Sequence, residues 1–161
     1  MHPILAQRSR LRLYLAGWLL VAAMLAEMFA LAGGLGWAES IALAVPLAAV
    51  YAFVCLASWY LCRALPLDRT PLATLAVSHL AASLAGGLFW LAVARALAAA
   101  WAPIYAGIEE RASRQANLLF GMGALLFLLA VAAHYAILAV EATAEAAQRE
   151  VEARLLAQQA V

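Results

Sequence analysis

Long charge-free stretches alternate with short polar breaks along this chain, and the pattern predicts four membrane-spanning helices. About 20 apolar residues at a rise of ~1.5 Å each cross the ~30 Å hydrocarbon core of a bilayer. The breaks contain turn-forming residues: the glycines 33, 34 and 36, the Pro66–Pro71 turn, and Pro103. The predicted spans cover residues 11–35, 40–65, 72–101 and 115–140.

The fourth stretch continues beyond its apolar part without a residue that would end a helix. Gln115–Val140 contains no Asp, Glu, Lys or Arg, whereas charged side chains are frequent from Glu141 onward. Neither Gly nor Pro separates the two parts, so we expect one helix that leaves the membrane and enters the cytoplasm. The predicted fold is therefore an all-α membrane protein. Residues 1–140 form a four-transmembrane-helix bundle that acts as a sensor domain, and residues 141–161 begin a cytoplasmic signalling helix or coiled coil.

Two patterns bear on association with a second copy. The 4-3-4 spacing of Val140, Ala144, Ala147 and Val151 resembles the start of a coiled-coil seam, and a single solvated helix is the alternative. Small residues also recur at helical spacing in the third span, where they indicate either packing inside the bundle or a dimer face. They form two rows: Ser78, Ala82 and Gly86, and then His79, Ser83 and Gly87. We expect a homodimer.

Composition supports membrane insertion and excludes several classes. Hydrophobic residues make up 68% of the 161 residues and charged residues 12%, with a net charge of +1, so a nucleic-acid partner is not expected. Leu13–Gly36 is too long for the apolar core of a cleaved signal peptide. Cys55 and Cys62 lie two turns apart on one helix and cannot form a disulfide.

The arginines predict the orientation. With four crossings, both termini share one side, and most arginines lie there. The positive-inside rule makes that side cytoplasmic, which predicts a multi-pass membrane protein with both termini in the cytoplasm and membrane lipid around it. The arginines on that side are Arg8, Arg10, Arg12, Arg63, Arg69, Arg149 and Arg154.

Four polar residues inside the predicted spans are candidates for sensing a stimulus. Glu27 lies in the outer half of the first span, and Arg95 lies near the outer edge of the third, where it can reach toward Glu27. His79 and His134 fall at similar depth in the third and fourth spans. Two such histidines can hold a haem or a metal, form a proton-sensitive pair, or hydrogen-bond in the bundle interior. We expect neither a haem nor a metal ion here, because no ligand spacing within a helix accompanies them.

No set of catalytic residues is recognisable, so the chain by itself shows no enzyme chemistry. Three functions remain open. The first is a sensor module whose fourth helix is the output. The second is a small membrane subunit that binds haem or metal through His79 and His134. The third is a scaffold or transporter-like bundle in which Glu27 couples to an ion.

Two stretches carry a family resemblance. The run Tyr51–Leu67, YAFVCLASWYLCRALPL, resembles the second membrane helix of LytS/YehU-type bacterial sensor histidine kinases. The tail Glu145–Ala160, EAAQREVEARLLAQQA, resembles the helix that leads into their phosphoacceptor region. The phosphoacceptor histidine motif of that family and its ATP-binding domain are absent from this chain.

The resemblance implies a role as the membrane input portion of a two-component sensor kinase. Such a protein is a homodimer in the inner membrane and changes its helix arrangement on a stimulus. The kinase core, absent here, then passes phosphate to a response regulator. No catalytic residue carries over to this chain.

Overall fold

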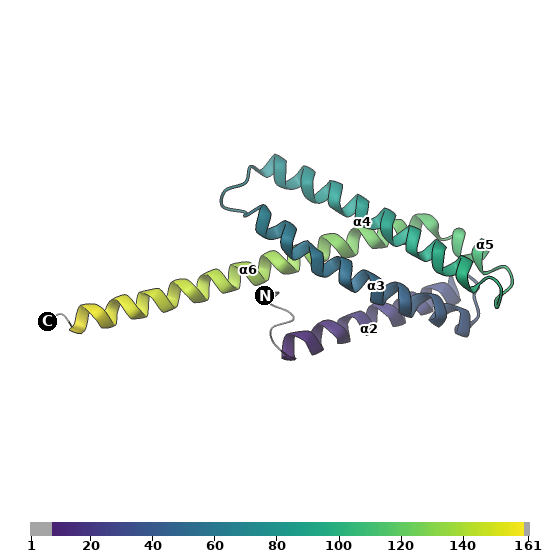
Figure 1. Cartoon of the computed structure of the whole chain (residues 1–161), viewed down its shortest axis with the longest axis horizontal. Helices are drawn as coiled ribbons and strands as arrows, with labels where there is room; N and C mark the ends of the chain where they lie inside the picture. Colours follow the sequence, from purple (N-terminus) through teal and green to yellow (C-terminus); the bar gives the residue numbers. More distant parts are fainter. Residues whose placement is uncertain (1–7, 160–161) are drawn as a thin grey trace.

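The computed structural model describes residues 8–159 and consists of helices joined by short loops (Figure 1). Four of the helices are long and apolar enough to cross a membrane, so the chain is an all-α, multi-pass membrane protein. The helices are α2 (Arg8–Leu31), α3 (Trp37–Ala64), α4 (Leu72–Trp101), α5 (Ile108–Ser113) and α6 (Ala116–Gln159).

The helix boundaries follow the turn residues closely. The third predicted span coincides with α4, whereas α2 ends at Leu31, four residues before the predicted end. Gly34 has φ of +66°, a left-handed conformation that favours glycine and that ends the helical path there. The short helix α5 was not predicted; it occupies the connection between α4 and α6.

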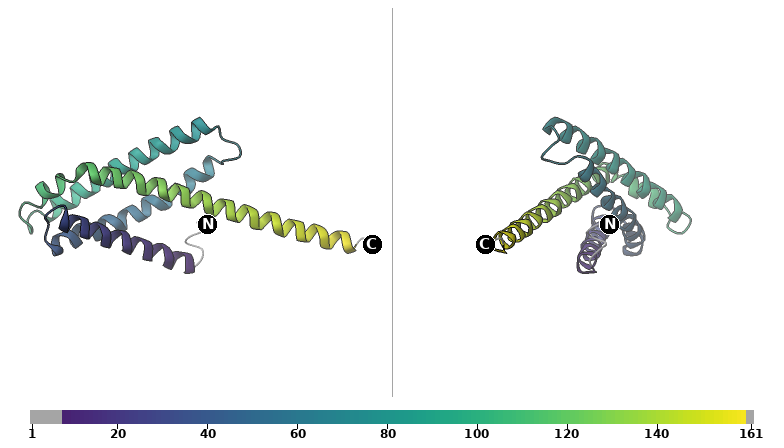
Figure 2. Two further views of the ribbon diagram at one scale, coloured as in Figure 1. Left: turned by 180° about the vertical axis from the view of Figure 1, so that it is seen from behind. Right: turned by 60° about the vertical axis from the view of Figure 1, so that its left-hand side comes forward.

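Helix α6 is unbroken from the bundle into the projecting segment. Its 44 residues include Val140–Thr143 without an interruption, which confirms the prediction of one continuous helix. At ~1.5 Å per residue it is about 66 Å long, roughly twice the thickness of the hydrocarbon core. We call residues 141–159 the stalk. In Figures 1 and 2 the stalk stands clear of the other helices.

The stalk is solvated and internally paired. Arg149 Nη2 lies 3.1 Å from Glu145 Oε2, and Arg154 pairs with Glu150 in the same i,i+4 register. The predicted seam residues Val140, Ala144, Ala147 and Val151 are all exposed in the single chain. A partner helix would therefore find these positions uncovered.

Inside the bundle, α6 packs most extensively against α4, and α2 packs mainly on α3. Glycines permit the α4–α6 approach. A Cβ atom added to Gly123 would lie 2.8 Å from Trp90 Cβ, which is closer than real Cβ atoms approach, and 3.1 Å from Gly87 Cα, which is an unusually tight contact. His79, Ser83 and Gly87 are all buried. This row of small residues thus packs inside the bundle, as one of the two alternatives predicted.

The first helix and the exit of the last helix lie at the same end of the molecule. Arg10 Nη1 is 3.1 Å from Glu141 Oε1, which joins the start of α2 to the start of the stalk. We call this the stalk end and the opposite end, where α5 lies, the α5 end (Figure 1).

Candidate functional site

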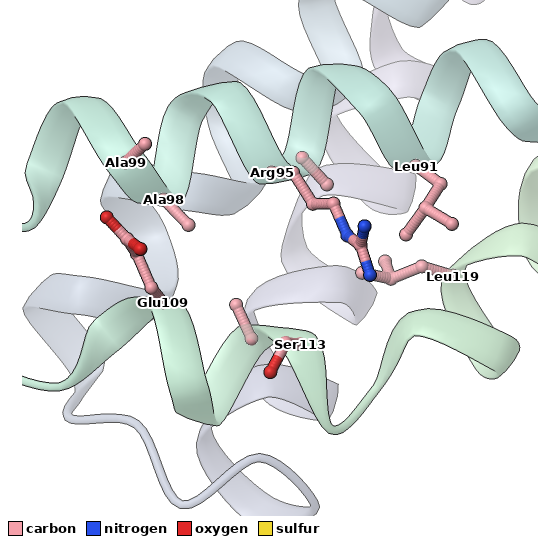
Figure 3. Close-up of a pocket in the computed structure, with 9 residues that line it drawn as sticks. Leu91, Arg95, Ala98, Ala99, Glu109, Ser113 and Leu119 are labelled. Carbon is pink, nitrogen blue, oxygen red and sulfur yellow. The ribbon is translucent and has the colours of Figure 1, made fainter.

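A pocket of about 300 Å³ lies at the α5 end, between α4 and α5 (Figure 3). Its walls are mostly apolar, with two charged side chains and one hydroxyl group. Arg95 comes from α4, and Glu109 and Ser113 come from α5. The remaining lining residues are Leu91, Ala94, Ala98, Ala99, Ala112 and Leu119.

Helix α5 presents different faces to the pocket and to α3. Residues 109 and 113 are one turn apart on the pocket side. Arg111 points the other way, where its Nη2 lies 2.6 Å from Glu39 Oε1 of α3. The Arg111 side chain is 26% exposed and that of Glu39 17%, so this ion pair is partly shielded from water. The pair fixes α5 to α3 and so holds one wall of the pocket.

A second contact fixes the end of α4 to α3. Pro46 lies inside α3 and has no N–H group, so the carbonyl of Ala42 loses its helical hydrogen bond. Trp101 Nε1 donates to that carbonyl oxygen at 3.1 Å. Both walls of the pocket are therefore anchored to α3.

The first turn of α6 closes the pocket from a third side. Leu119 lines the pocket and is 1% exposed, so it also belongs to the packed interior. A change in the spacing of α4 and α5 would press directly on the helix that forms the stalk. The geometry connects the pocket to the stalk through one element.

At the stalk end, buried polar groups hold α6 to α3. His134 Nδ1 lies 2.9 Å from Ser58 Oγ and 2.8 Å from the carbonyl oxygen of Ala130. Ser58 donates its single proton to the carbonyl of Cys55 at 2.7 Å. Nδ1 must therefore carry the hydrogen that His134 shares with Ser58 and Ala130.

The other histidine joins α4 to α6 through a tyrosine. His79 Nδ1 donates to the carbonyl of Leu75 at 2.7 Å, and His79 Nε2 lies 3.2 Å from the hydroxyl of Tyr135. That hydroxyl also lies 2.7 Å from the carbonyl oxygen of Leu65, the C-cap of α3. Tyr135 of α6 therefore contacts both α4 and the end of α3.

The structure separates the four predicted sensing residues. Glu27 lies on an exposed face of α2 and forms no ion pair with Arg95, nor with any other residue among those described. Arg95 instead faces the pocket, while His79 and His134 bind partners on different helices. Within residues 8–159, no group of three or more His, Cys, Asp or Glu side chains is placed to hold a metal ion.

Two features of the site were missed at the level of sequence. One is Glu109, which stands in a polar connection among other charged residues. The other is the pairing of Glu39 with Arg111, which are 72 residues apart. The position of Glu39 did carry a sequence signal, because a glutamate three residues after a helix N-cap often caps the helix. In the structure the N–H of Gly36 donates to Glu39 Oε2 at 2.8 Å. No pattern pointed to Glu109.

Comparison of the chain with protein-family models, with curated proteins and with solved structures found no match.

Proposed function

We propose that the chain is the transmembrane input module of a two-component sensor histidine kinase. It relays a membrane or extracellular stimulus through α6 to a kinase core that this chain does not contain. The observation that carries the proposal is the unbroken course of α6 from the pocket at the α5 end to Gln159 of the stalk. A rigid helix transmits a shift or rotation along its length because its backbone hydrogen bonds resist local bending.

The contacts of α6 support a role as the moving part. It is held by individual polar contacts with α3 and α4, including Tyr51 Oη to the carbonyl of Gly123 at 2.6 Å. After a small displacement of α6, the groups in these contacts can form hydrogen bonds with other partners. An element that switches between two positions requires such alternative contacts. The resemblance of the second span and the stalk to LytS/YehU-type kinases points to a histidine kinase core as the part that α6 would control. The protein then acts as a homodimer in a bacterial inner membrane, with both termini cytoplasmic and a response regulator downstream.

The proposal predicts that output depends on the helical phase of the stalk. One to four alanines, or seven, are inserted after Ala144 in a fusion of this chain to a histidine kinase core. Each residue rotates the downstream helix by about 100°, so two residues turn it by about 200° and seven nearly restore the phase. Basal autophosphorylation in membranes should change most with two alanines and return with seven.

A second insertion separates rotation from loss of rigidity. Four glycines at the same place have the length of four alanines but favour a break in the helix. The glycines should uncouple the kinase core from the bundle. Autophosphorylation should then stay at one level when alanines are added to the glycine variant. Phosphorylation that stays the same through the whole alanine series would contradict a rigid relay.

A further inference from the structure

Among the described charged residues near the α5 end, Arg95, Glu109 and Glu27 form no ion pair, and of these Arg95 and Glu109 line a pocket. Two ion pairs use four others: Arg111 with Glu39 at 2.6 Å, and Arg114 with Glu110 at 3.5 Å. Arg95 and Glu109 form no ion pair within residues 8–159, with each other or with a third residue. Both of them line the same pocket.

We infer that this pocket binds a small zwitterion, with its anionic group at Arg95 and its ammonium group at Glu109. A free anion would satisfy Arg95 but would meet the Glu109 carboxylate in the same pocket. A free cation would have the reverse conflict with Arg95. A molecule that carries both charges neutralises both ends of the pocket.

The position of Arg95 makes an anionic partner valuable. Arg95 precedes Trp101 by six residues, which places it about 9 Å deeper than an aromatic residue suited to the membrane interface. The pocket wall around it is built from leucine and alanine side chains. Arg95 and Glu109 are both exposed in the single chain, so a ligand can reach them. In a bilayer, a cation at that depth interacts more strongly with a bound anion than it would in water.

The arrangement also limits where the ligand can carry its charges. In Figure 3 the guanidinium of Arg95 extends toward Leu91 and Leu119, while the carboxylate of Glu109 lies beside Ala98 and Ala99. The two charges therefore lie at different levels along α4, and a ligand that meets both must carry its own two charges at opposite ends.

A polar route leads to the anionic end. Glu109 and Ser113 also border a second hollow, of about 490 Å³, together with Ala102, Gly107 and Glu110. The ammonium group of a ligand can therefore approach Glu109 from the side of the loops, ahead of the apolar part of the pocket. The same charge pattern occurs in the headgroup of an ethanolamine phospholipid, where phosphate replaces the carboxylate.

The inference that the pocket binds a zwitterion does not depend on the proposed function. The role of this ligand as the stimulus does depend on it. An occupant between α4 and α5 touches Leu119, in the first turn of α6. The binding experiment below uses no kinase core, and the alanine insertions use no ligand. Failure of one therefore leaves the other standing.

The test is calorimetric titration of the whole chain, reconstituted in nanodiscs of phosphatidylglycerol, with glycine oligomers of one to four residues. The series finds the length that binds best, and we expect both the N-acetylated and the C-amidated form of that oligomer to bind at least tenfold more weakly. Glu109→Gln should remove the difference between free and N-acetylated peptide. Arg95→Gln should remove the difference between free and amidated peptide.

A matched control removes a pair of charges far from the pocket. The double variant Arg149→Gln/Glu145→Gln breaks an ion pair within the stalk, leaves the net charge unchanged and should bind the peptide like the parent chain. Nanodiscs that contain phosphatidylethanolamine show whether the natural ligand is a lipid or a soluble molecule. Loss of peptide binding in them assigns the site to the lipid headgroup. Retained binding assigns it to a soluble zwitterion. The inference is overturned if the blocked peptides bind as well as the free one, if the control variant loses binding equally, or if neither peptide nor phosphatidylethanolamine binds.

Discussion

Single polar contacts inside this bundle satisfy backbone groups that a helix cannot satisfy itself. The carbonyl of Leu65 at the end of α3 accepts from Tyr135, and the carbonyl of Ala42, freed by Pro46, accepts from Trp101. In a lipid environment no water replaces such a donor. Each contact therefore fixes the position of one helix against another at a defined residue.

Tyr135→Phe should destabilise the bundle, because it removes the donor to Leu65 and the contact with His79 Nε2. The expected loss is about 0.5–1.5 kcal/mol of unfolding free energy, the net contribution of a typical hydrogen bond, because both contacts are only part-buried. Denaturant titration in detergent micelles measures it. Tyr60→Phe is the matched control: Tyr60 is 69% exposed, and the same atom lost there should change stability by less than about 0.5 kcal/mol. Equal losses in the two variants would refute this role of the Tyr135 hydroxyl.

Depth along a helix could be predicted from the sequence, but the direction of a side chain around the helix could not. Arg95 was expected to be a functional residue near the outer edge of its span, and it does line a pocket. Its expected neighbour was Glu27, at a comparable level, whereas the structure gives it Glu109 across the pocket. Which residues face each other depends on the rotation and crossing of helices. Close packing between helices determines their rotation and crossing angles, and the sequence of one span contains little information about either.

At the scale of elements, long periodic features were predictable and short ones were not. The continuity of α6 followed from the absence of Gly, Pro or a capping signal between residues 124 and 159. Helix α5 has only six residues, begins after Gly107 at φ of +74°, and owes its placement to the ion pair of Arg111 with Glu39. A helix that depends on such a distant contact leaves no periodic pattern.

The α4–α6 interface depends on the absence of a side chain at one glycine. Gly123→Ala places a methyl group 2.8 Å from Trp90 Cβ, where backbone and ring must move apart, at a cost of about 1–3 kcal/mol. Gly121→Ala, two residues away on the same helix, meets nothing within 4 Å and should be neutral or stabilising by up to about 1 kcal/mol. Thermal unfolding followed by circular dichroism distinguishes the two. A Gly123→Ala variant as stable as Gly121→Ala would show that the helices can separate without loss.

At the scale of the whole molecule, α2 has little contact with α6. It packs mainly on α3, and an apolar groove of about 630 Å³ separates it from α6. The groove runs from Val21 to Arg10, and the ion pair of Arg10 with Glu141 spans it at the stalk end. Both side chains are 38% exposed, so the pair contributes at most about 1 kcal/mol. A contact of that strength can open and close at little cost in free energy.

Arg10→Gln should therefore loosen the placement of α2 against the stalk while changing global stability by less than about 1 kcal/mol. Spin labels at two exposed positions, Ala16 on α2 and Ala144 on the stalk, report the separation by double electron–electron resonance, with Cys55 and Cys62 replaced by serine or alanine. The distance distribution should broaden in Arg10→Gln and in Glu141→Gln, because each variant removes the same bridge. Arg149→Gln breaks an ion pair within the stalk alone and should leave the distribution as in the parent. If Arg10→Gln also leaves it unchanged, packing on α3 alone positions α2, and the ion pair merely results from that position. If it broadens, an ion pair worth under about 1 kcal/mol holds the first helix against the last, and in the proposed sensor module a stimulus would need to supply no more than that free energy to separate them.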